Sequence, residues 1–261
     1  MDSFYIITNE TKDRGLETTG RVKGLLAGYG KKCVDEAGQA DCVLVLGGDG
    51  TMLKAAVDLA DISAPMLGIN LGNLGFLAEV EESQIESAIA QVIKGEYEIE
   101  RRMMLTGSVN DGAGHDALNE VVIAGSKPMQ LIYFDLYVKG LLLSSYVADG
   151  MIVSTATGST AYNLSAGGPL VEPGANVLLL TPVCSHTLRN RSIILAPDEE
   201  VALMLTAGKY GEEQRCLAIF DGHNRVEIKS GDCLRIARSK RTTAIVKLSK
   251  MNFLEILKQK L

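Results

Sequence analysis

Residues 42–57, CVLVLGGDGTMLKAAV, contain the most informative pattern in this chain of 261 residues. The apolar run 42–46 is typical of a buried parallel strand, and the residues after Thr51 predict the first turns of a helix. Between them, a glycine-rich turn lets bare backbone N–H groups approach an anion, and the helix N-terminus adds a partial positive charge. The stretch therefore predicts a strand–turn–helix unit that holds a phosphate group.

An aspartate lies inside this predicted phosphate site. The carboxylate of Asp49 repels phosphate, so anion binding alone does not favour it there. A catalytic role does, because Asp49 can take a proton from a substrate hydroxyl that attacks a phosphoryl group held by the neighbouring glycines. The alternative is a plain tight turn in which the aspartate makes a local side-chain hydrogen bond. The turn is not a Walker A loop, because no Gly-Lys-Ser/Thr ends it.

Composition places the chain among ordinary globular proteins of two domains. Its length exceeds one typical core, and 46% of its residues are hydrophobic. No apolar run reaches about 18 residues, so we expect no membrane partner, and the first residues lack the regions of a signal peptide. Five scattered cysteines without a CxxC pair favour reduced thiols and a cytoplasmic location.

The charge of the chain restricts its partners. A net charge of −6 and a pI of about 5.2 argue against a nucleic-acid partner. An acidic protein that binds phosphate must therefore use local donors, and a glycine-rich backbone is such a donor set. Three scattered histidines do not suggest a metal site built by the protein, so we predict no metal-ligating residue.

Strands and helices alternate in the first hundred residues. Apolar runs predict strands at 4–8, 42–46 and 66–69, and residues with helical spacing lie between and after them. This alternation predicts a parallel, doubly wound sheet, in which ligands bind beyond the carboxyl ends of the strands. A second glycine loop, residues 68–76, follows the strand 66–69 and belongs at the same edge of the sheet. Its alternative is a packing turn.

After residue 100 the pattern changes to short runs of β-type residues, the last of them at 233–237, which predict a β-rich, sandwich-like domain. A final strand at 244–248 and a helix at 253–260 return to the earlier pattern and are expected to pack back on the first domain. We therefore predict an N-terminal α/β domain, residues 1–100 joined by 243–261, and a β-rich domain, residues 101–242.

Three polar segments interrupt the apolar runs of the β-rich part. Asn119-Glu120 lies in a strand-like stretch and either faces water or holds ribose hydroxyls. Residues 154–162, shortly after Asp149-Gly150, carry six hydroxyl side chains and predict a helix start with Thr157 or Ser159 as N-cap. The same hydroxyls and free N–H groups can hold a phosphate or an adenine edge. Phe220-Asp221-Gly222-His223 is typical of a hairpin turn.

In their order, these motifs resemble those of the bacterial NAD kinases, the ATP-NAD kinase family. Residues 47–51 match the GGDGT motif of that family, and Asn119-Glu120 match its NE motif. Residues 149–162 match its glycine-rich segment. Further matches are Gly167-Gly168-Pro169, residues 186–191 and Asp221-Gly222. The resemblance covers nearly the whole chain, and the ordered set is far more specific than the GGDGT turn alone.

The resemblance implies a function: phosphorylation of the 2′-hydroxyl of the adenosine ribose of NAD⁺ by ATP or another phosphoryl donor, giving NADP⁺. It implies Asp49 as the general base. The other implied site residues contact the substrates: Gly48, Gly50, Thr51, Phe76, Asn119, Glu120, Asp149, Thr157, Thr160, Ala161 and Tyr162. Asp149 is expected to reach the nicotinamide half of NAD⁺, often across a subunit boundary.

The resemblance further implies that Mg²⁺ or another divalent cation enters with ATP, and that the protein forms a homodimer or homotetramer. Two alternatives remain at this stage. A lipid kinase of the diacylglycerol kinase type should have a greasy substrate entrance or a basic membrane face, and the sequence shows neither. A catalytically silent dinucleotide-binding protein has no need for Asp49 in its glycine turn.

Overall fold

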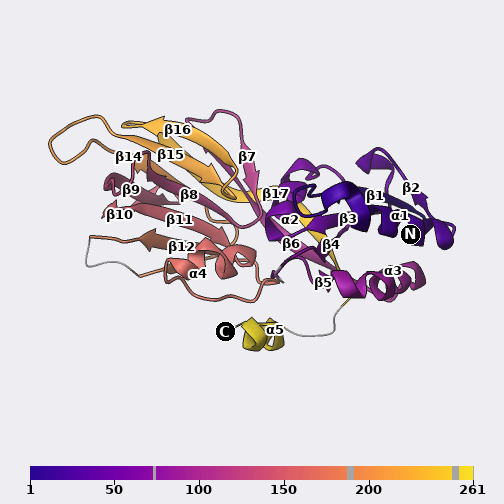
Figure 1. Ribbon diagram of the computed structural model, residues 1–261. Helices are drawn as coiled ribbons and strands as arrows, with labels where there is room; N and C mark the ends of the chain where they lie inside the picture. The colour runs from indigo at the N-terminus through magenta and orange to yellow at the C-terminus, as the bar shows by residue number, and fades with distance from the viewer. Residues whose placement is uncertain (73–74, 187–190, 249–252, 261) are drawn as a thin grey trace. The chain divides into compact units, whose positions relative to one another are not determined.

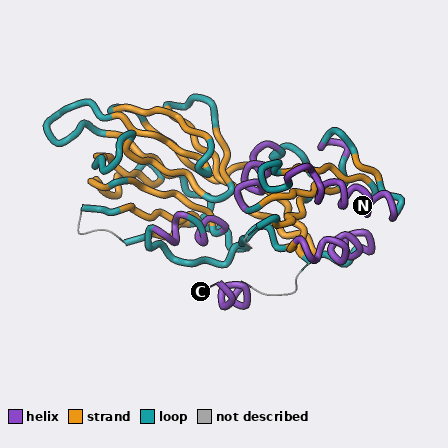
Figure 2. Tube along the Cα trace, viewed as in Figure 1, coloured by secondary structure: helices purple, strands orange, loops and turns teal. Residues whose placement is uncertain are grey.

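The computed structural model describes residues 1–72, 75–186, 191–248 and 253–260 (Figure 1). The chain divides into two compact units, and each is described by itself. The first contains Met1–Arg102 and Thr242–Leu261, and the second contains Met103–Arg241. Helices gather in the first unit and strands dominate the second (Figure 2). In the described part of the chain, no helix is long and apolar enough to cross a membrane.

A parallel sheet forms the centre of the first unit. Its strands lie in the order β2-β1-β3-β4, and β5 and the end of β17 both pair with β4. Every residue of β3 and β4 is buried, as expected for parallel strands covered on both faces. The strands are β1 Ser3–Thr8, β2 Lys32–Cys33, β3 Cys42–Gly47, β4 Met66–Asn70, β5 Val80–Glu81 and β17 Cys233–Lys247.

Helices cover both faces of this sheet. The helices of the unit are α1 Glu17–Gly28, α2 Asp49–Asp58, α3 Ile85–Lys94 and α5 Phe253–Lys260, with short 3₁₀ turns at Arg14–Leu16, Ala37–Gln39 and Glu82–Gln84. α1 and α3 share one hydrophobic cluster with β1, β3 and β4. α2 packs elsewhere: a Cβ on Gly68 of β4 would lie 3.0 Å from the Met52 sulfur and 2.7 Å from the Ala78 Cα. The predicted doubly wound architecture is confirmed.

Helix α2 begins earlier than the sequence predicts. The prediction placed its start at Thr51, after the glycine turn, whereas the first helical residue is Asp49 and Gly48 is the N-cap. An acidic residue in the first turn of a helix is stabilised by the partial positive charge there. Residues 47–51 therefore form both the loop after β3 and the first residues of helix α2.

Two antiparallel sheets form the second unit. One contains β10-β9-β14-β17, with β6 paired to β7 and β17, and the other has the order β13-β12-β11-β8-β15-β16. The strands are β6 Glu98–Val109, β7 His115–Ala117, β8 Glu120–Gly125, β9 Ile132–Val138, β10 Leu141–Ala148, β11 Gly150–Thr155, β12 Leu178–Val183, β13 Ile193–Leu195, β14 Val201–Leu205, β15 Arg215–Phe220 and β16 Asn224–Lys229. The 3₁₀ turn η4 Thr157–Thr160 and the short helix α4 Tyr162–Ser165 follow β11.

One hydrophobic cluster contains residues of both sheets, from β8, β11 and β15 on one side and β9, β14 and β17 on the other. Within it the rings of Phe134 and Tyr146 stack with centroids 5.5 Å apart. Side chains that alternate along each strand fill the space between the sheets, which is the packing of a β-sandwich. This confirms the predicted β-rich, sandwich-like domain.

The largest difference from the sequence prediction concerns β17. The sequence predicts separate strands at 233–237 and 244–248, but β17 is one strand of 15 residues. The residues between the two predicted strands are polar, so the sequence did not indicate that they belong to the same strand. Its side chains have partners: the Ser239 hydroxyl donates to Asp116 at 3.1 Å, and Arg241 forms an ion pair with the same carboxylate at 2.8 Å. Strands β5, β6, β7 and β13 were not predicted.

We expect Gly68→Ala to lower the free energy of unfolding by about 1–3 kcal/mol, because the added methyl group collides with the Ala78 backbone and overpacks the contact with Met52 of α2. Gly24→Ala in α1 is the matched control, since nothing lies within 4 Å of the added Cβ and alanine favours a helix by ~1 kcal/mol. Chemical denaturation measures both. Equal stability of the two variants would contradict the close packing at Gly68.

Candidate functional site

Three loops meet where the parallel strands of the first unit end. The loop after β1 is joined to β3 by a hydrogen bond from the Asn9 N–H to the Leu46 carbonyl at 2.9 Å. The loop after β4 is joined to the glycine turn by a bond from the Leu71 N–H to the Gly47 carbonyl at 2.8 Å. The glycine turn therefore lies between two other loops at the carboxyl edge of the sheet, the edge at which such sheets bind ligands.

The carboxylate of Asp49 is held by the loop after β4. It accepts the backbone N–H groups of Phe76 at 2.7 Å and of Leu77 and Ala78 at 3.1 Å each. A Cβ on Gly75 would collide with this carboxylate, so residue 75 must be glycine. The bonds join residues 27–29 positions apart and are not the local bond of a plain tight turn.

These bonds leave limited capacity on Asp49. A carboxylate has about four lone-pair directions, and three N–H groups occupy three of them: two on Oδ1 and one on Oδ2. The fourth, on Oδ2, can accept the proton of a substrate hydroxyl. Asp49 is also only half-buried. Its geometry therefore fits two roles: it fixes the backbone of Phe76, and it keeps one acceptor position for a ligand.

The other predicted residues of the glycine turn differ in what they can do. The Thr51 hydroxyl accepts the Gly48 N–H at 3.4 Å and the Asn9 side-chain amide at 3.3 Å, so it closes the turn. Gly50 is exposed, and a Cβ there would meet open space. The side of the turn at Gly50 is thus accessible to a ligand.

In the second unit, Asp221 fixes the start of β8. Its carboxylate accepts the N–H groups of Leu118 at 2.7 Å, Asn119 at 2.9 Å and Glu120 at 3.0 Å. Asp221 and Gly222 have φ angles of 47° and 72°, which suit the primed hairpin turn that Asp-Gly favours. The hairpin prediction is confirmed, but the sequence did not reveal that this turn orients Asn119 and Glu120.

Asn119 and Glu120 are buried polar residues with unused capacity. Their exposed fractions are 7% and 8%, and neither Asn119 Oδ1 nor Glu120 Oε2 has a hydrogen-bond partner among the described residues. An unsatisfied buried polar atom costs ~1–3 kcal/mol. A ligand that supplies the missing hydrogen bonds would remove this cost, so the pair marks a binding site.

Burial and the neighbouring Asp221 raise the pKa of Glu120 to about 8. Burial also raises the pKa of Asp221, against the opposing effect of its three backbone N–H bonds. At neutral pH Glu120 is therefore mainly protonated. A protonated carboxyl both donates and accepts a hydrogen bond, and so does a sugar hydroxyl.

The hydroxyl-rich segment packs directly on this pair. The Ser154 hydroxyl donates to the Asn119 carbonyl at 3.1 Å, and the Thr155 hydroxyl donates to the Leu118 carbonyl at 2.7 Å. Gly158 lies so close to the Asn119 carbonyl that a Cβ would collide with it. The predicted N-cap was wrong: the hydroxyl that accepts a free N–H of the turn, from Gly158 at 3.2 Å, belongs to Thr155.

The remaining predicted site residues lie at the two opposite ends of strand β11. Thr157 is buried, Thr160 and Ala161 are half-buried, and Tyr162 is exposed; all four follow the end of β11 that pairs with the start of β8. Asp149 precedes the other end of β11. Gly150 pairs with Ala124, whereas Ser154 pairs with Glu120, so Asp149 lies five residues, or about 17 Å, along the strand from Glu120.

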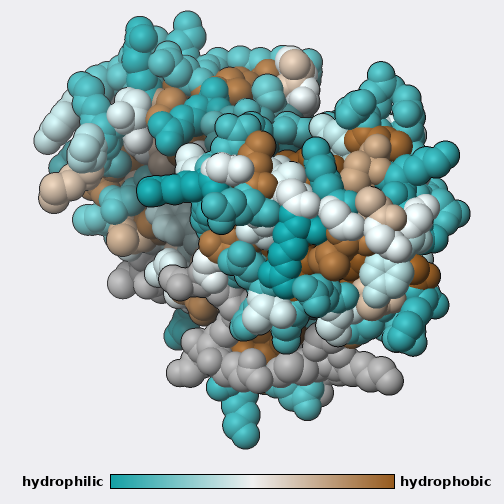
Figure 3. Space-filling view, turned by 45° about the vertical axis from the view of Figure 1, so that its right-hand side comes forward, coloured by the Kyte–Doolittle hydropathy of each residue, from teal (hydrophilic) through white to brown (hydrophobic). Residues whose placement is uncertain are grey.

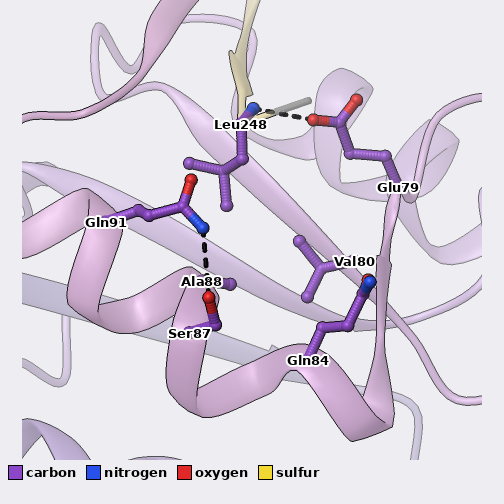
Figure 4. Close-up of a pocket in the computed structure, with 7 residues that line it drawn as sticks. All are labelled: Glu79, Val80, Gln84, Ser87, Ala88, Gln91 and Leu248. Carbon is purple, nitrogen blue, oxygen red and sulfur yellow. Dashed lines mark hydrogen bonds between the residues drawn. The ribbon is translucent and has the colours of Figure 1, made fainter. Parts of the chain in front are cut away.

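A separate cavity of about 240 Å³ lies in the first unit between α3 and the end of β17 (Figure 4). The Glu79 carboxylate accepts the Leu248 N–H at 2.7 Å at its rim. No residue of the predicted site lines it. Among the described residues, no group of three or more His, Cys, Asp or Glu side chains is arranged to hold a metal ion.

Comparison with known proteins gives consistent matches over the chain. The model of the ATP-NAD kinase N-terminal domain matches residues 7–97, and that of the ATP-NAD kinase C-terminal domain matches residues 118–248. The NAD kinase of Lachnospira eligens is 38% identical over 293 aligned positions and covers 100% of both chains. The NAD kinase of Lachnoclostridium phytofermentans is 37% identical, covering 100% of this chain and 99% of that relative.

Two solved structures share the fold. Yeast NADH kinase complexed with NADH superposes with a TM-score of 0.89 at 20% identity, covering 100% of this chain and 87% of that one. An NAD kinase from Archaeoglobus fulgidus in complex with ATP gives a TM-score of 0.80 at 24% identity, covering 95% and 94%. At these identities the likeness concerns the architecture.

We expect Glu120→Gln to change how stability depends on pH. The carboxyl of an unfolded chain loses its proton near pH 4.5, whereas folded Glu120 keeps it up to about pH 8. The folded state binds more protons in this window, so the stability that Glu120 contributes falls as the pH rises from 4.5 to about 8. The stability of the Gln variant relative to the parent should therefore increase across the window. The exposed Glu227→Gln is the control. Denaturation at several pH values that showed a constant difference for Glu120→Gln would contradict its raised pKa.

Proposed function

Since this chain belongs to the ATP-NAD kinase family, we propose that it transfers the terminal phosphoryl group of ATP to the 2′-hydroxyl of the adenosine ribose of NAD⁺. The bond between the ribose oxygen and phosphorus forms, and the bond to the bridging oxygen of ATP breaks. The products are NADP⁺ and ADP. The observation that carries this proposal is a glycine turn with an aspartate at the carboxyl edge of a parallel sheet, in a chain that matches both family domains.

Asp49 takes the proton of the 2′-hydroxyl in this proposal. Its Oδ2 has one lone pair that the backbone of Phe76 does not use, which supports this role. Gly48, Gly50 and Thr51 contact phosphate groups at the turn. Phe76, whose N–H Asp49 holds, packs beside the adenine. Positioning and electrostatic stabilisation then provide most of the catalysis, as is general for phosphoryl transfer.

The second unit binds the nucleotide. The unpaired Asn119 Oδ1 and Glu120 Oε2 support a role in holding ribose hydroxyls or the neighbourhood of the adenine. Thr157, Thr160, Ala161 and Tyr162 line the NAD pocket, with the two threonines in the turn that packs on Asn119. A buried polar pair of this kind favours a ligand with hydroxyl groups. A ligand without them leaves Asn119 Oδ1 and Glu120 Oε2 without hydrogen-bond partners.

Mg²⁺ or another divalent cation enters as the complex with ATP. Mg²⁺ prefers oxygen ligands and retains several waters, and it commonly binds through substrate phosphates with one or two carboxylates. All five cysteines are free thiols, which supports the proposed cytoplasmic location.

Neither alternative function gains support. On the face shown in Figure 3, hydrophobic residues lie in patches among hydrophilic ones. The family models and the relatives named above are NAD kinases and not lipid kinases. The Asp49 carboxylate holds the backbone of residues 76–78 and would do so in a silent binding protein as well, so the argument against that alternative is the match to both domains of a kinase family.

We expect Asp49→Asn to lower turnover of NAD⁺ by ~10²–10⁴-fold, the usual contribution of a positioned base. An asparagine side chain cannot accept three N–H groups as a carboxylate does, so the affinity for NAD⁺ should also fall through Phe76. Asp58→Asn, exposed at the end of the same helix, is the control. An NAD⁺ and ATP assay measures the rates, and phosphorus NMR identifies the 2′-phosphate. Near-normal turnover by Asp49→Asn would exclude Asp49 as the base.

The active species in this proposal is a homodimer or homotetramer. Asp149 lies about 17 Å along the strand from Glu120, and its carboxylate has no hydrogen-bond partner among the described residues. Both observations support its proposed role at the nicotinamide half of an NAD⁺ molecule bound to a neighbouring subunit.

We therefore expect specific activity to fall when dilution separates the subunits, since a shared pocket opens as they part. Light scattering locates the dissociation point, and activity is measured above and below it. Constant specific activity across that point would rule out a shared pocket while leaving the kinase function intact.

A further inference from the structure

The side chain of Lys12 lies against both glycine loops of the first unit. Its ammonium nitrogen is 2.8 Å from the position that a Cβ on Gly48 would occupy, and 3.4 Å from the corresponding position at Gly72. Gly48 belongs to the turn after β3 and Gly72 to the loop after β4. The ammonium therefore covers the bare backbone at the place where these two loops meet.

The backbone of Lys12 is held firmly, although its side chain is exposed. The Lys12 N–H donates to the Asn9 carbonyl at 2.9 Å, and the Asn9 amide is bonded to Thr51 of the glycine turn. The next residue, Asp13, is buried and accepts the N–H groups of Thr18 and Thr19 at 2.9 Å each. The backbone of this loop is therefore already ordered, so binding a ligand at the Lys12 ammonium would cost little further backbone entropy.

Lys12 has no carboxylate partner among the described residues. Other lysines of this unit do: Lys31 pairs with Asp2 at 2.6 Å, and Lys247 pairs with Glu79. The nearby Asp49 carboxylate is bonded to backbone N–H groups instead. An unneutralised ammonium over bare glycine backbone, in a chain with a net charge of −6, is suited to an anion of high charge.

We propose that Lys12 binds the phosphate groups of the phosphoryl donor at the glycine turns and stabilises the charge that develops on the transferring phosphoryl group. This inference rests on the proposed kinase function. The turn lacks the lysine that ends a Walker A loop, and Lys12 supplies an equivalent charge from the loop after β1. Charge stabilisation of this kind is the main protein contribution to phosphoryl transfer.

The glycine at position 48 is explained by the space beside it and not by its backbone angles. Its φ of −135° and ψ of −170° are extended values that any residue adopts. Apart from its two chain neighbours, the Lys12 ammonium nitrogen is the only atom of the described residues within 4 Å of a Cβ there. The absence of a side chain at 48 therefore provides space for the ammonium, and Gly48→Ala becomes a second, independent way to displace it.

The test compares Lys12→Ala, Lys12→Arg, Gly48→Ala and the double variant, with Lys23→Ala, an exposed lysine of α1, as the charge-matched control. We expect Lys12→Ala to lower kcat/KM for Mg-ATP by ~10²–10³-fold, the usual cost of losing one donor to developing charge. The KM for NAD⁺ should stay within about threefold, because NAD⁺ recognition in the proposed function rests on other residues. Lys12→Arg should retain part of the activity, and Lys23→Ala should behave as the parent.

Gly48→Ala should impair turnover less than Lys12→Ala, because the end of the lysine side chain can shift away from the added methyl group. The double variant should be little worse than Lys12→Ala, because both changes act on the same contact. Multiplied effects in the double variant, or a parent-like Lys12→Ala, would overturn the inference. Because Lys12 is exposed, its variants should keep the thermal stability of the parent.

Calorimetry with inorganic tripolyphosphate and Mg²⁺ separates this inference from the kinase function. The parent should bind this probe, and Lys12→Ala should bind it at least about tenfold more weakly. Binding that depends on Lys12 without any NADP⁺ formation would overturn the kinase function alone. Equal binding by both proteins, with NADP⁺ formed by the parent, would overturn the role of Lys12 alone.

Discussion

Hydrogen bonds from backbone N–H groups to aspartate carboxylates hold the loops on which the proposed site depends. Asp49 joins the glycine turn to Phe76, Leu77 and Ala78. Asp221 joins a hairpin turn to the start of β8. Asp13 joins the loop after β1 to the start of α1. In each case the side chain pairs N–H groups that no strand or helix satisfies, and such groups are costly when buried without a partner.

Backbone N–H bonds lower the pKa of both Asp13 and Asp221, but the net shifts of the two carboxyls have opposite directions. Burial acts to raise the pKa of Asp13, but hydrogen bonds from Thr19 and Thr18 outweigh it, and the net pKa is lowered. At Asp221 burial prevails over three backbone N–H bonds, and the net pKa is raised. Glu120 lies beside Asp221 without a hydrogen-bond partner on Oε2, and burial together with the Asp221 charge raises its pKa so that it keeps its proton. A neutral Glu120 thereby spares the site two adjacent buried charges.

Sequence reasoning identified the residues that follow strong local patterns. The apolar runs and the glycine turn predicted the parallel strands, their carboxyl edge and Asp49 at that edge. What it missed is long-range: the partners of Asp49 lie 27–29 residues away, and those of Asp221 lie 101–103 residues away. No periodicity encodes such pairs. The polar middle of β17 misled for the same reason, since its partner Asp116 lies 123–125 residues away. Lys12 was overlooked because a lone exposed lysine in a loop carries no pattern.

The glycines of the motifs also need a different explanation from the one that the sequence offers. A glycine-rich turn suggests unusual backbone angles, yet Gly48, Gly75 and Gly158 all have ordinary φ values. Space explains each of them: Gly75 leaves room for the Asp49 carboxylate, Gly158 leaves room for the Asn119 carbonyl, and Gly48 lets the Lys12 ammonium approach the backbone. Two of these three spaces are filled by charged groups of the chain itself. The proposed phosphate site therefore obtains its cation and its base by bringing side chains from distant loops onto bare backbone. This is how an acidic chain can hold a polyanion without a basic surface, because the attraction then acts over contact distances where solvent and salt screen it least.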